Sequence, residues 1–436
     1  MKTKVFSAVG LFFLSATMLF SQQKLSLSDA IKIALGNNYD INLAKKDVEI
    51  SGNNYSLGNA GFLPRVDASG SQTRTVTKTK QEYSDGSSVN ENEASSNSTY
   101  ANIALSWTLF DGFKMFTSYS KLREYKELGE IQLRNQIENS LSDVIQTYYD
   151  LVRQKYLYRV AKESITISEE RVRLAKEKLS VGSASQLDVL RAKVDLNSDK
   201  SNLLAQEVTI NSLKVTLNKL LSRSAAGDFD VDDTIAIREG LSFEQLNEAA
   251  LKNNAVVLQY EKNKILSSYD VSLSKTDYFP SLSLIGGYTY QKSQSDANLV
   301  KANRSYGYNY GLNLSWNLFN GFTTQLQYEN ALISLDKSDI ELRQSRSLLE
   351  SNMLIAYKNY EKNLEILKLE DENVSVAKEN LDLAIDQLNL GSLSPLEFRD
   401  VQKNYTTAQS RLASARFTAK MSEKDLLKLS GMMLSQ

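Results

Sequence analysis

The 436-residue sequence contains neither cysteine nor histidine. Without cysteine, the chain has no disulfide bonds and no thiol that could carry a lipid at its mature N-terminus. The same absences exclude thiol and imidazole catalysis, and they exclude zinc sites built from these residue types. The formal net charge is −1, so the composition indicates no surface for nucleic acid or another polyanion.

Proline is also scarce, with three residues, and the hydrophobic fraction is a modest 42%. This composition favours long helices with narrow apolar seams over globular domains with thick cores. After the first 21 residues, no segment offers a long uninterrupted apolar run, so we expect no transmembrane helix in the mature chain.

The N-terminus has the pattern of a secretory signal peptide over residues 1–21. Lys2 and Lys4 precede an apolar run from Val5 to Phe20, and the small residue Ser21 follows it. A run of about 16 residues is short for a bilayer-spanning helix. The alternative is a buried first helix.

Four short segments recur in the same order, 216 or 209 positions later, which predicts an internal tandem duplication. The pairs are 34–38 with 250–254, 62–64 with 278–280, 106–113 with 315–322, and 179–185 with 388–394. The offset between matching segments falls from 216 to 209 between residues 64 and 106, because the first copy has a longer loop there. We predict repeat 1 over 22–224, repeat 2 over 241–436, and a crossover at 225–240 between them.

Each repeat is expected to contain a short helix, a two-stranded hairpin, a long helix, a tight turn and a return helix. In repeat 1 the hairpin spans about 64–110, the long helix 112–181 and the return helix 185–224; in repeat 2 the ranges are about 280–319, 321–390 and 394–431. Each long helix lacks proline and would extend about 105 Å.

The second strand of each hairpin shows strict alternation. In 306–318, tyrosine, leucine and tryptophan alternate with glycine, asparagine and serine, and 101–109 follows the same pattern. The strand is about 13 residues long, enough to cross a membrane, and aromatic residues end its apolar side. We predict a lipid-facing belt composed of Trp107, Tyr306, Tyr308, Tyr310 and Trp316.

The other side of these strands would line a watery lumen, whereas a half-buried strand of a soluble sandwich is the alternative. Four strands cannot close a barrel, and open edges are not tolerated in lipid, so several protomers would pool their strands. Polar loops are expected at 81–98 and 293–303.

Heptad spacing predicts coiled-coil seams on the helices. The seam residues are Ile165, Ser168, Val172, Ala175 and Leu179, and 209 positions later Val374, Ala377, Leu381, Ala384 and Leu388. On the return helix of repeat 1, Leu187, Leu190, Val194, Asn197, Ser201, Leu204 and Val208 keep the same spacing.

These features together resemble the TolC-like outer-membrane efflux family over nearly the whole mature chain. The residues that carry the resemblance are Pro64 and Pro280 before the hairpins, the strand ends 107–112 and 316–321, and the turns 179–182 and 388–391. The resemblance implies an α+β membrane protein: a homotrimer whose protomers give four strands each to a twelve-stranded transmembrane β-barrel, continued by a long α-helical coiled-coil periplasmic tunnel.

The resemblance also implies a function and a location. The chain would be a passive duct, not an enzyme, in the outer membrane of a Gram-negative bacterium, with a large periplasmic portion. It would serve tripartite efflux or type I secretion, together with a periplasmic adaptor (membrane fusion) protein and an inner-membrane pump of the RND, ABC or MFS type. The cargo stays open among drugs, metal ions and proteins.

Two turns and four junction residues are candidate functional positions. The turns are Val181, Gly182 and Ser183, and Leu390, Gly391 and Ser392. A glycine here is typical of a left-handed helix end, and the resemblance adds that the turns dock the adaptor. The helix–strand junctions are Pro64, Pro280, Gly112 and Gly321.

Asp188, Glu397 and Asp400 are candidate gate residues, because the resemblance implies an acidic ring at the periplasmic mouth. Helix capping is the alternative for the first two, since a serine lies three residues before each. Repeat 1 has Arg191 where repeat 2 has Asp400. Leu388 and Leu393 stand where the family often has an aromatic and a basic residue, so the closing network must differ.

The aspartates of the crossover, at 228, 230, 232 and 233, lack the spacing of a calcium loop and indicate a solvated turn. No phosphate-binding loop, nucleophile–base pair or nucleic-acid patch is present, so we predict no cofactor, no metal and no catalytic residue. The alternative function is a periplasmic coiled-coil adaptor or structural protein without a membrane barrel.

Overall fold

The structure is a computed structural model that describes residues 24–296 and 300–433. The signal peptide expected at 1–21 lies outside the described residues. These residues form two compact units. The strand unit comprises 40–138, 241–357 and 425–433, and the turn unit comprises 24–39, 139–240 and 358–424.

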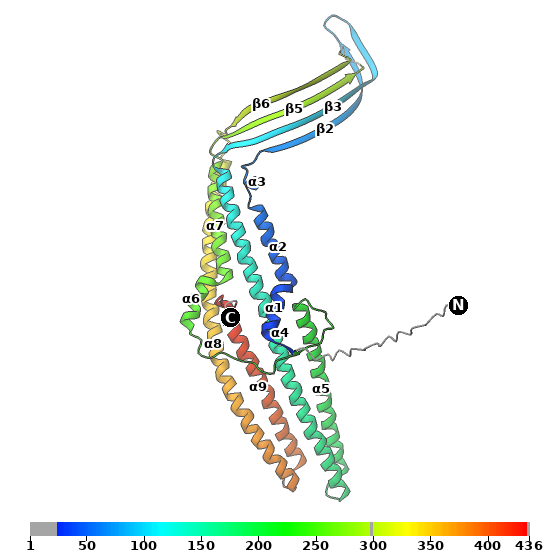
Figure 1. Cartoon of the computed structure of the whole chain (residues 1–436), viewed down its shortest axis with the longest axis vertical. Helices are drawn as coiled ribbons and strands as arrows, with labels where there is room; N and C mark the ends of the chain where they lie inside the picture. The colour runs from blue at the N-terminus through cyan, green and yellow to red at the C-terminus, as the bar shows by residue number, and fades with distance from the viewer. Residues whose placement is uncertain (1–23, 297–299, 434–436) are drawn as a thin grey trace, which may run out of the picture. The chain divides into compact units, whose positions relative to one another are not determined.

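The strand unit contains one four-stranded antiparallel sheet in the order β2-β3-β5-β6 (Figure 1). The strands are β2 (Arg65–Glu82), β3 (Ser88–Asp111), β5 (Ser281–Ser295) and β6 (Ala302–Ser315). The two hairpins share one register. Each pair of facing residues in the β2–β3 hairpin, over 65–77 of β2, has an equivalent pair in the β5–β6 hairpin. The equivalent of a β2 residue lies 216 positions later and that of a β3 residue lies 209 positions later. The pair Arg65–Ser106 thus corresponds to Ser281–Ser315.

The strand ends differ from the expected ones in both hairpins. The polar loop expected at 81–98 is mostly strand, because Glu82 still pairs with Ser88 across a tight turn. The strand expected to run to about 319 ends at Ser315. Within the described residues, the edge strand β6 pairs with β5 alone, and β5 begins at Ser281, opposite Ser315. β3 continues to Asp111 because β5 pairs with it there.

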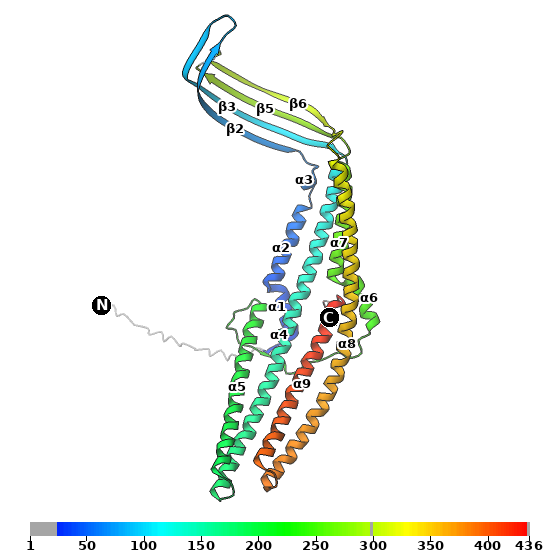
Figure 2. The ribbon, with the colours of Figure 1, turned by 180° about the vertical axis from the view of Figure 1, so that it is seen from behind.

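The helices of the strand unit are α2 (Tyr39–Asn54), α3 (Leu57–Ala60), α6 (Phe243–Asn253), α7 (Ala255–Thr276) and the first parts of α4 (Lys114–Ser180) and α8 (Thr323–Leu390). In both ribbon views α7 lies along α8 (Figures 1 and 2). Ser267 of α7 bonds to Ser338 of α8 at 2.8 Å, and Lys262 of α7 pairs with Glu124 of α4 at 2.7 Å. α7 therefore joins the two long helices.

The turn unit is built from the last parts of α4 and α8 and the helices that return alongside them. These are α5 (Gln186–Leu220) and α9 (Pro395–Leu429). α1 (Leu27–Asn37) and a parallel pair of short strands, β1 (Lys24–Leu25) and β4 (Asp230–Val231), complete the unit. The seam predicted along α8 is confirmed: Leu381, Ala384 and Leu388 are buried in one cluster with Phe398 and Tyr405 of α9.

The heptad face predicted on α5 is not the face that this helix buries within the chain. Leu187, Leu190, Val194, Leu204 and Val208 are 49–67% exposed. The buried side of α5 instead carries Val189, Ala192 and Asp199. The heptad spacing identifies an apolar stripe, but packing against α4 and α9 selects a different face of the helix.

Ion pairs anchor three aspartates of the crossover, Asp230, Asp232 and Asp233. Lys155 of α4 contacts Asp230 at 2.8 Å and Asp233 at 2.7 Å, while Lys24 contacts Asp232 at 3.1 Å. The hydrogen bond from Lys155 holds the pKa of Asp233 below its ordinary value. These aspartate side chains are 39–48% exposed, so the segment is solvated in part and also anchored to α4.

Among residues 24–296 and 300–433, none of the helices combines the length and the apolarity needed to cross a bilayer.

Candidate functional site

The two helix–helix turns have the same geometry. Gly182 has φ +78° and Gly391 has φ +76°, the left-handed conformation that glycine adopts without steric cost. The amide of Ser183 donates to Lys178 O at 2.8 Å, and that of Ser392 donates to Gln387 O at 3.0 Å. These bonds satisfy carbonyls that the helix end would leave free.

Both turns are bare. Among residues 24–296 and 300–433, a Cβ added at either glycine would meet nothing within 4 Å. The residue before each glycine is apolar and extensively exposed, Val181 at 77% and Leu390 at 82%. Each turn therefore presents an uncovered apolar side chain.

Asp188 and Glu397 close capping boxes at the next helix starts. Asp188 accepts from the amide and the hydroxyl of Ser185 at 3.0 and 2.7 Å, and Glu397 does the same with Ser394 at 3.0 and 2.7 Å. Hydrogen bonds from the serine side chain and backbone lower the pKa of both carboxyls. The capping interpretation is confirmed for both acids.

Asp400 lies exposed on α9, one turn beyond Glu397. In the described part of the chain, no hydrogen bond or ion pair joins Asp188, Glu397 and Asp400 to one another. An acidic ring therefore depends on further copies of the chain. Leu388 is buried, and Leu393 packs against the same core cluster, so these two leucines are packing residues and not parts of a polar closing network.

A pocket of about 450 Å³ lies between the two turns, within the turn unit. Its charged lining residues are Arg171, Lys178, Asp188, Arg191, Asp195 and Arg399. Leu388 and Leu396 supply apolar surface, and Lys178 Nζ donates to Leu388 O at 3.2 Å. The pocket thus has both charge signs around an apolar floor.

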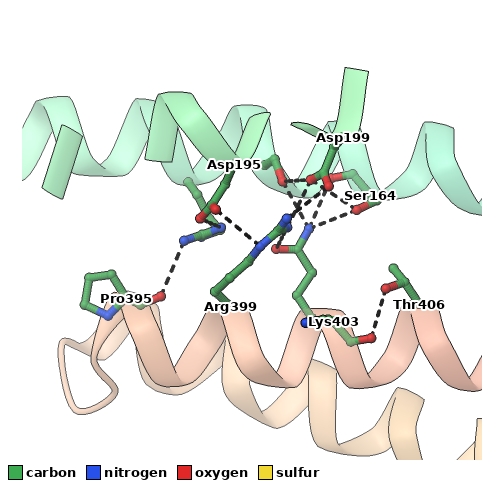
Figure 3. A network of polar contacts seen from close by, with 10 residues as sticks. Ser164, Asp195, Asp199, Pro395, Arg399, Lys403 and Thr406 are labelled. Atoms are coloured by element: carbon green, nitrogen blue, oxygen red, sulfur yellow. Dashed lines mark hydrogen bonds and ion pairs between the residues drawn. The ribbon is translucent and has the colours of Figure 1, made fainter. Parts of the chain in front are cut away.

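A buried polar network joins the helices of repeat 1 to α9 of repeat 2. Arg399 reaches from α9 toward Asp195 and Asp199 of α5 (Figure 3). Its two terminal nitrogens each donate to one oxygen of Asp199 at 3.0 Å. Ser168 of α4 donates to the same carboxylate at 2.6 Å. Asp199 as a whole residue is 7% exposed, so the guanidinium of Arg399 compensates a buried charge.

Two further side chains complete this network. Gln402, fully buried, donates to Ser168 Oγ at 3.1 Å. Arg171 of α4 contacts Asp195 at 3.1 Å, and its burial lowers its pKa despite that partner. Burial also opposes the charge of Arg399, but its bonds with Asp199 outweigh this and raise its pKa.

We did not predict this network from the sequence, because Asp199 and Arg399 are 200 positions apart. Asp199 also lies off the apolar heptad on which the α5 seam was predicted. The available signal was the four-residue spacing of Asp195 with Asp199 and of Ser164 with Ser168. Residues four apart share one helix face, and small hydroxyl residues on one helix allow close approach of a polar partner.

The junction residues lie where strands and helices meet. Pro64 and Pro280 immediately precede β2 and β5. Gly112 and Gly321 follow β3 and β6, and each is left-handed, as is the phenylalanine after it, Phe113 with φ +69° and Phe322 with φ +64°. The same unusual turn therefore occurs twice.

The two tryptophans of the predicted belt have a second role. Trp107 Nε1 donates to Phe62 O at 2.9 Å, and Trp316 Nε1 donates to Tyr278 O at 3.1 Å. The acceptors lie two residues before Pro64 and Pro280. Each indole therefore fixes the end of one strand to the start of its partner.

The apolar face of the sheet carries the tyrosines. Tyr308 and Tyr310 are stacked at 6.4 Å between ring centroids, and they are 80% and 81% exposed. Tyr306 and Tyr308 are directly opposite Tyr290 and Tyr288 of β5. The polar face carries the alternating glycine, asparagine and serine residues, so the sheet is amphipathic across its thickness.

No group of three or more acidic, cysteine or histidine side chains, among the residues whose structure is described, is arranged to hold a metal ion.

Comparisons with known proteins agree over most of the chain. The family model described as "Outer membrane efflux protein" matches residues 30–223 and 246–432. The outer membrane efflux protein BepC of Brucella suis is 20% identical over 430 residues, covering 96% of this chain and 89% of BepC. The toluene efflux pump outer membrane protein TtgC of Pseudomonas putida is 23% identical over 418 residues, covering 93% and 83%.

A solved structure has the same fold. The CmeC outer membrane channel of Campylobacter jejuni superposes with a TM-score of 0.75 at 18% identity, covering 93% of this chain and 86% of CmeC.

Proposed function

The chain belongs to the outer membrane efflux protein family, and from this premise we propose that it forms the passive outer-membrane duct of a tripartite export system. The observation that carries the proposal is the amphipathic sheet of the strand unit, with β2 and β6 as its open edges. Such a sheet is stable in lipid only when its edges are closed and its polar face borders water. A periplasmic adaptor without a barrel does not account for this sheet.

We propose that three copies close the sheet into a twelve-stranded barrel. The open edges are β2 and β6, which run antiparallel to each other in the strand order. In the tandem duplication, β6 is the equivalent of β3, and β2 is the equivalent of β5. The pairing of β3 with β5 inside one chain is therefore the template for the pairing of β6 with β2 of the next chain. Because Ser106 pairs with Ile285, the template places Ser315 opposite Ser69 of the partner subunit.

The glycines agree with this register. Gly286 lies opposite Leu105 of β3 in the chain. The corresponding pair across the proposed seam is Leu314 with Gly70 of the partner subunit. The template thus places a glycine beside a leucine at both positions.

Exposed stripes on the helices also support association. On α8 the apolar residues Leu369, Val376, Leu383 and Leu390 repeat every seventh position and are 56–82% exposed. The stripe on α5 that keeps the heptad spacing is similarly uncovered. Heptad stripes of this kind are the surfaces that pair in coiled coils. We propose that they meet between neighbouring protomers and form the wall of the periplasmic tunnel.

Engineered disulfides test the assembly directly, because the chain has no cysteine of its own. Ser315→Cys with Ser69→Cys should give covalent trimers on non-reducing gels, since the two positions face each other across the seam. The matched control, Ser315→Cys with Thr73→Cys, is displaced by four residues, about 13 Å, and should not cross-link. Monomers with the first pair, or trimers with the control alone, would refute the register.

We propose that the two bare turns dock a periplasmic adaptor, which links the duct to an inner-membrane pump. The support is their exposed apolar residues Val181 and Leu390 and the mixed-charge pocket between them. Val181→Asp with Leu390→Asp should abolish export in cells while leaving single-channel conductance of the purified protein unchanged. Retained export would refute the docking role, and altered conductance would indicate damage to the duct.

We further propose that Glu397 and Asp400, repeated around the axis, give the tunnel mouth an acidic rim that attracts cations. Asp400 is exposed and has no role in the capping box, which supports a role beyond folding. Like charges gathered around a narrow pore favour cation entry and cation block. Cargo then passes without chemistry.

A further inference from the structure

The charges on the sheet are divided unequally between its two faces. On the apolar face, within 66–76, 97–107, 282–294 and 302–314, the charged residues are Arg74, Lys292 and Arg304. On the polar face, Arg65 is neutralised by Asp67 at 2.7 Å. The apolar face is therefore purely basic within these strand ranges.

Lys292 and Arg304 lie toward the strand ends that are remote from the helices, and Arg74 lies midway along β2. Lys292 is near the end of β5, and Arg304 is near the start of β6. Two positions closer to the helices, Tyr290 faces Tyr306, followed by Tyr288 facing Tyr308. A tyrosine girdle thus separates the basic residues from the leucine-rich part of the face.

Lys292 and Arg304 are directly opposite each other in the β5–β6 ladder. Cβ atoms of such cross-strand pairs are about 5 Å apart, and like charges in this position destabilise a sheet. The acid in the adjoining turn, Asp296, bonds to Ser95 on the β3 side. Within the described strands, neither cation has an acidic partner, so an external anion would relieve their repulsion.

We propose that Lys292 and Arg304 form a binding site for the phosphate of an outer-leaflet lipid headgroup, one site per protomer. This inference rests on the proposed function, which turns the apolar face toward lipid and directs the helix-remote end outward. Tyrosine girdles lie at the membrane interface, so cations just beyond them are at headgroup level. Arginine offers a fork that matches phosphate oxygens, and lysine adds a point charge.

The occupant is a lipid phosphate and not free phosphate, because the site adjoins an apolar surface that acyl chains would cover. The exposed leucines Leu312 and Leu314 continue the same face below the tyrosines. One lipid could thus contact the cations with its headgroup and this face with its tails. Basic residues at a membrane surface attract anionic lipids in the same way.

The test uses the purified full-length assembly in detergent and native mass spectrometry with three probes. These are a bisphosphorylated lipid A, the same glycolipid without phosphates, and inorganic phosphate. Lys292→Gln with Arg304→Gln should weaken binding of the phosphorylated lipid by about tenfold or more, since two charge-assisted contacts are lost. The control, Arg65→Gln with Lys114→Gln, removes the same charge near the helix end of the sheet and should bind normally.

The outcomes separate the two proposals. Equal binding by wild type and the Lys292→Gln, Arg304→Gln variant, or equal binding of the dephosphorylated glycolipid, overturns the lipid site. Binding of inorganic phosphate as tight as that of the lipid also overturns it, in favour of a simple anion site. The duct proposal is tested separately, by conductance in planar bilayers made without phosphorylated glycolipid. In these bilayers the Lys292→Gln, Arg304→Gln variant and the control variant should both still form channels.

Discussion

Gly112 and Gly321 occupy equivalent positions in the two repeats, after β3 and after β6. Replacing each with alanine distinguishes the cost of backbone strain from the cost of steric contact with a neighbouring subunit. Gly112 has φ +68° and Gly321 has φ +65°, so each alanine would be held in the left-handed region at about 1–2 kcal/mol. At Gly112 the added Cβ would also lie 2.7 Å from Thr276 O and 2.8 Å from Phe279 Cβ. Forcing the backbone apart there adds about 1–3 kcal/mol.

Gly112→Ala should therefore cost about 2–5 kcal/mol per protomer. Around Gly321, the described part of the single chain has no atom within 4 Å of the added Cβ. In a lone protomer, Gly321→Ala should then cost only the conformational part, about 1–2 kcal/mol. If the β3–β5 junction is the template for the seam, Gly321 in the trimer meets Ala60 and Leu63 of the partner subunit, and the two substitutions should cost the same.

The assay is denaturant unfolding of the purified assembly, followed by circular dichroism. Equal destabilisation by the two substitutions is the expected result. A Gly112→Ala variant as stable as wild type would refute the close approach at Thr276. A small effect of Gly321→Ala in the trimer would refute the equivalence of the two junctions.

Three other predictions concern the turn unit. Asp199→Ala should lower the free energy of unfolding by about 3 kcal/mol in denaturant, because Arg399 loses its buried partner. The double substitution Asp199→Leu with Arg399→Leu should recover most of that loss. If the destabilisations by the two single substitutions simply add in the double variant, the pairing is contradicted. The capping carboxyls of Asp188 and Glu397 have pKa values that are lowered in the folded protein. The stability that they contribute is therefore complete above about pH 4.5 and is lost as the pH falls through the folded pKa values. Hydrogen exchange of the two turns should rise over that range, and Asp188→Asn with Glu397→Gln should abolish the rise. Glu397→Gln with Asp400→Asn should reduce cation block in single-channel recordings, while Glu397→Gln alone keeps the cap; unchanged block in the double variant would eliminate the acidic rim.

Much of the fold follows from the sequence by itself. The two-residue alternation around Trp316 requires a strand with unlike faces, because neighbouring side chains point to opposite sides of a strand. The glycine turns at Gly182 and Gly391 follow from the left-handed conformation that ends a helix, and the serines three residues before Asp188 and Glu397 indicate the caps. These features depend on contacts between residues close in the chain, so local sequence is sufficient to specify them.

Only the tertiary structure decided how the elements meet. The heptad on α5 marks an apolar stripe, but the face buried in the chain is the one with Asp199, because Arg399 from the other repeat compensates its charge. The ends of β3 and β6 differ because one strand has two neighbours and the other has one. Gly112 is crowded and Gly321 is not, although their sequences match, because crowding depends on a segment 164 positions away at Thr276.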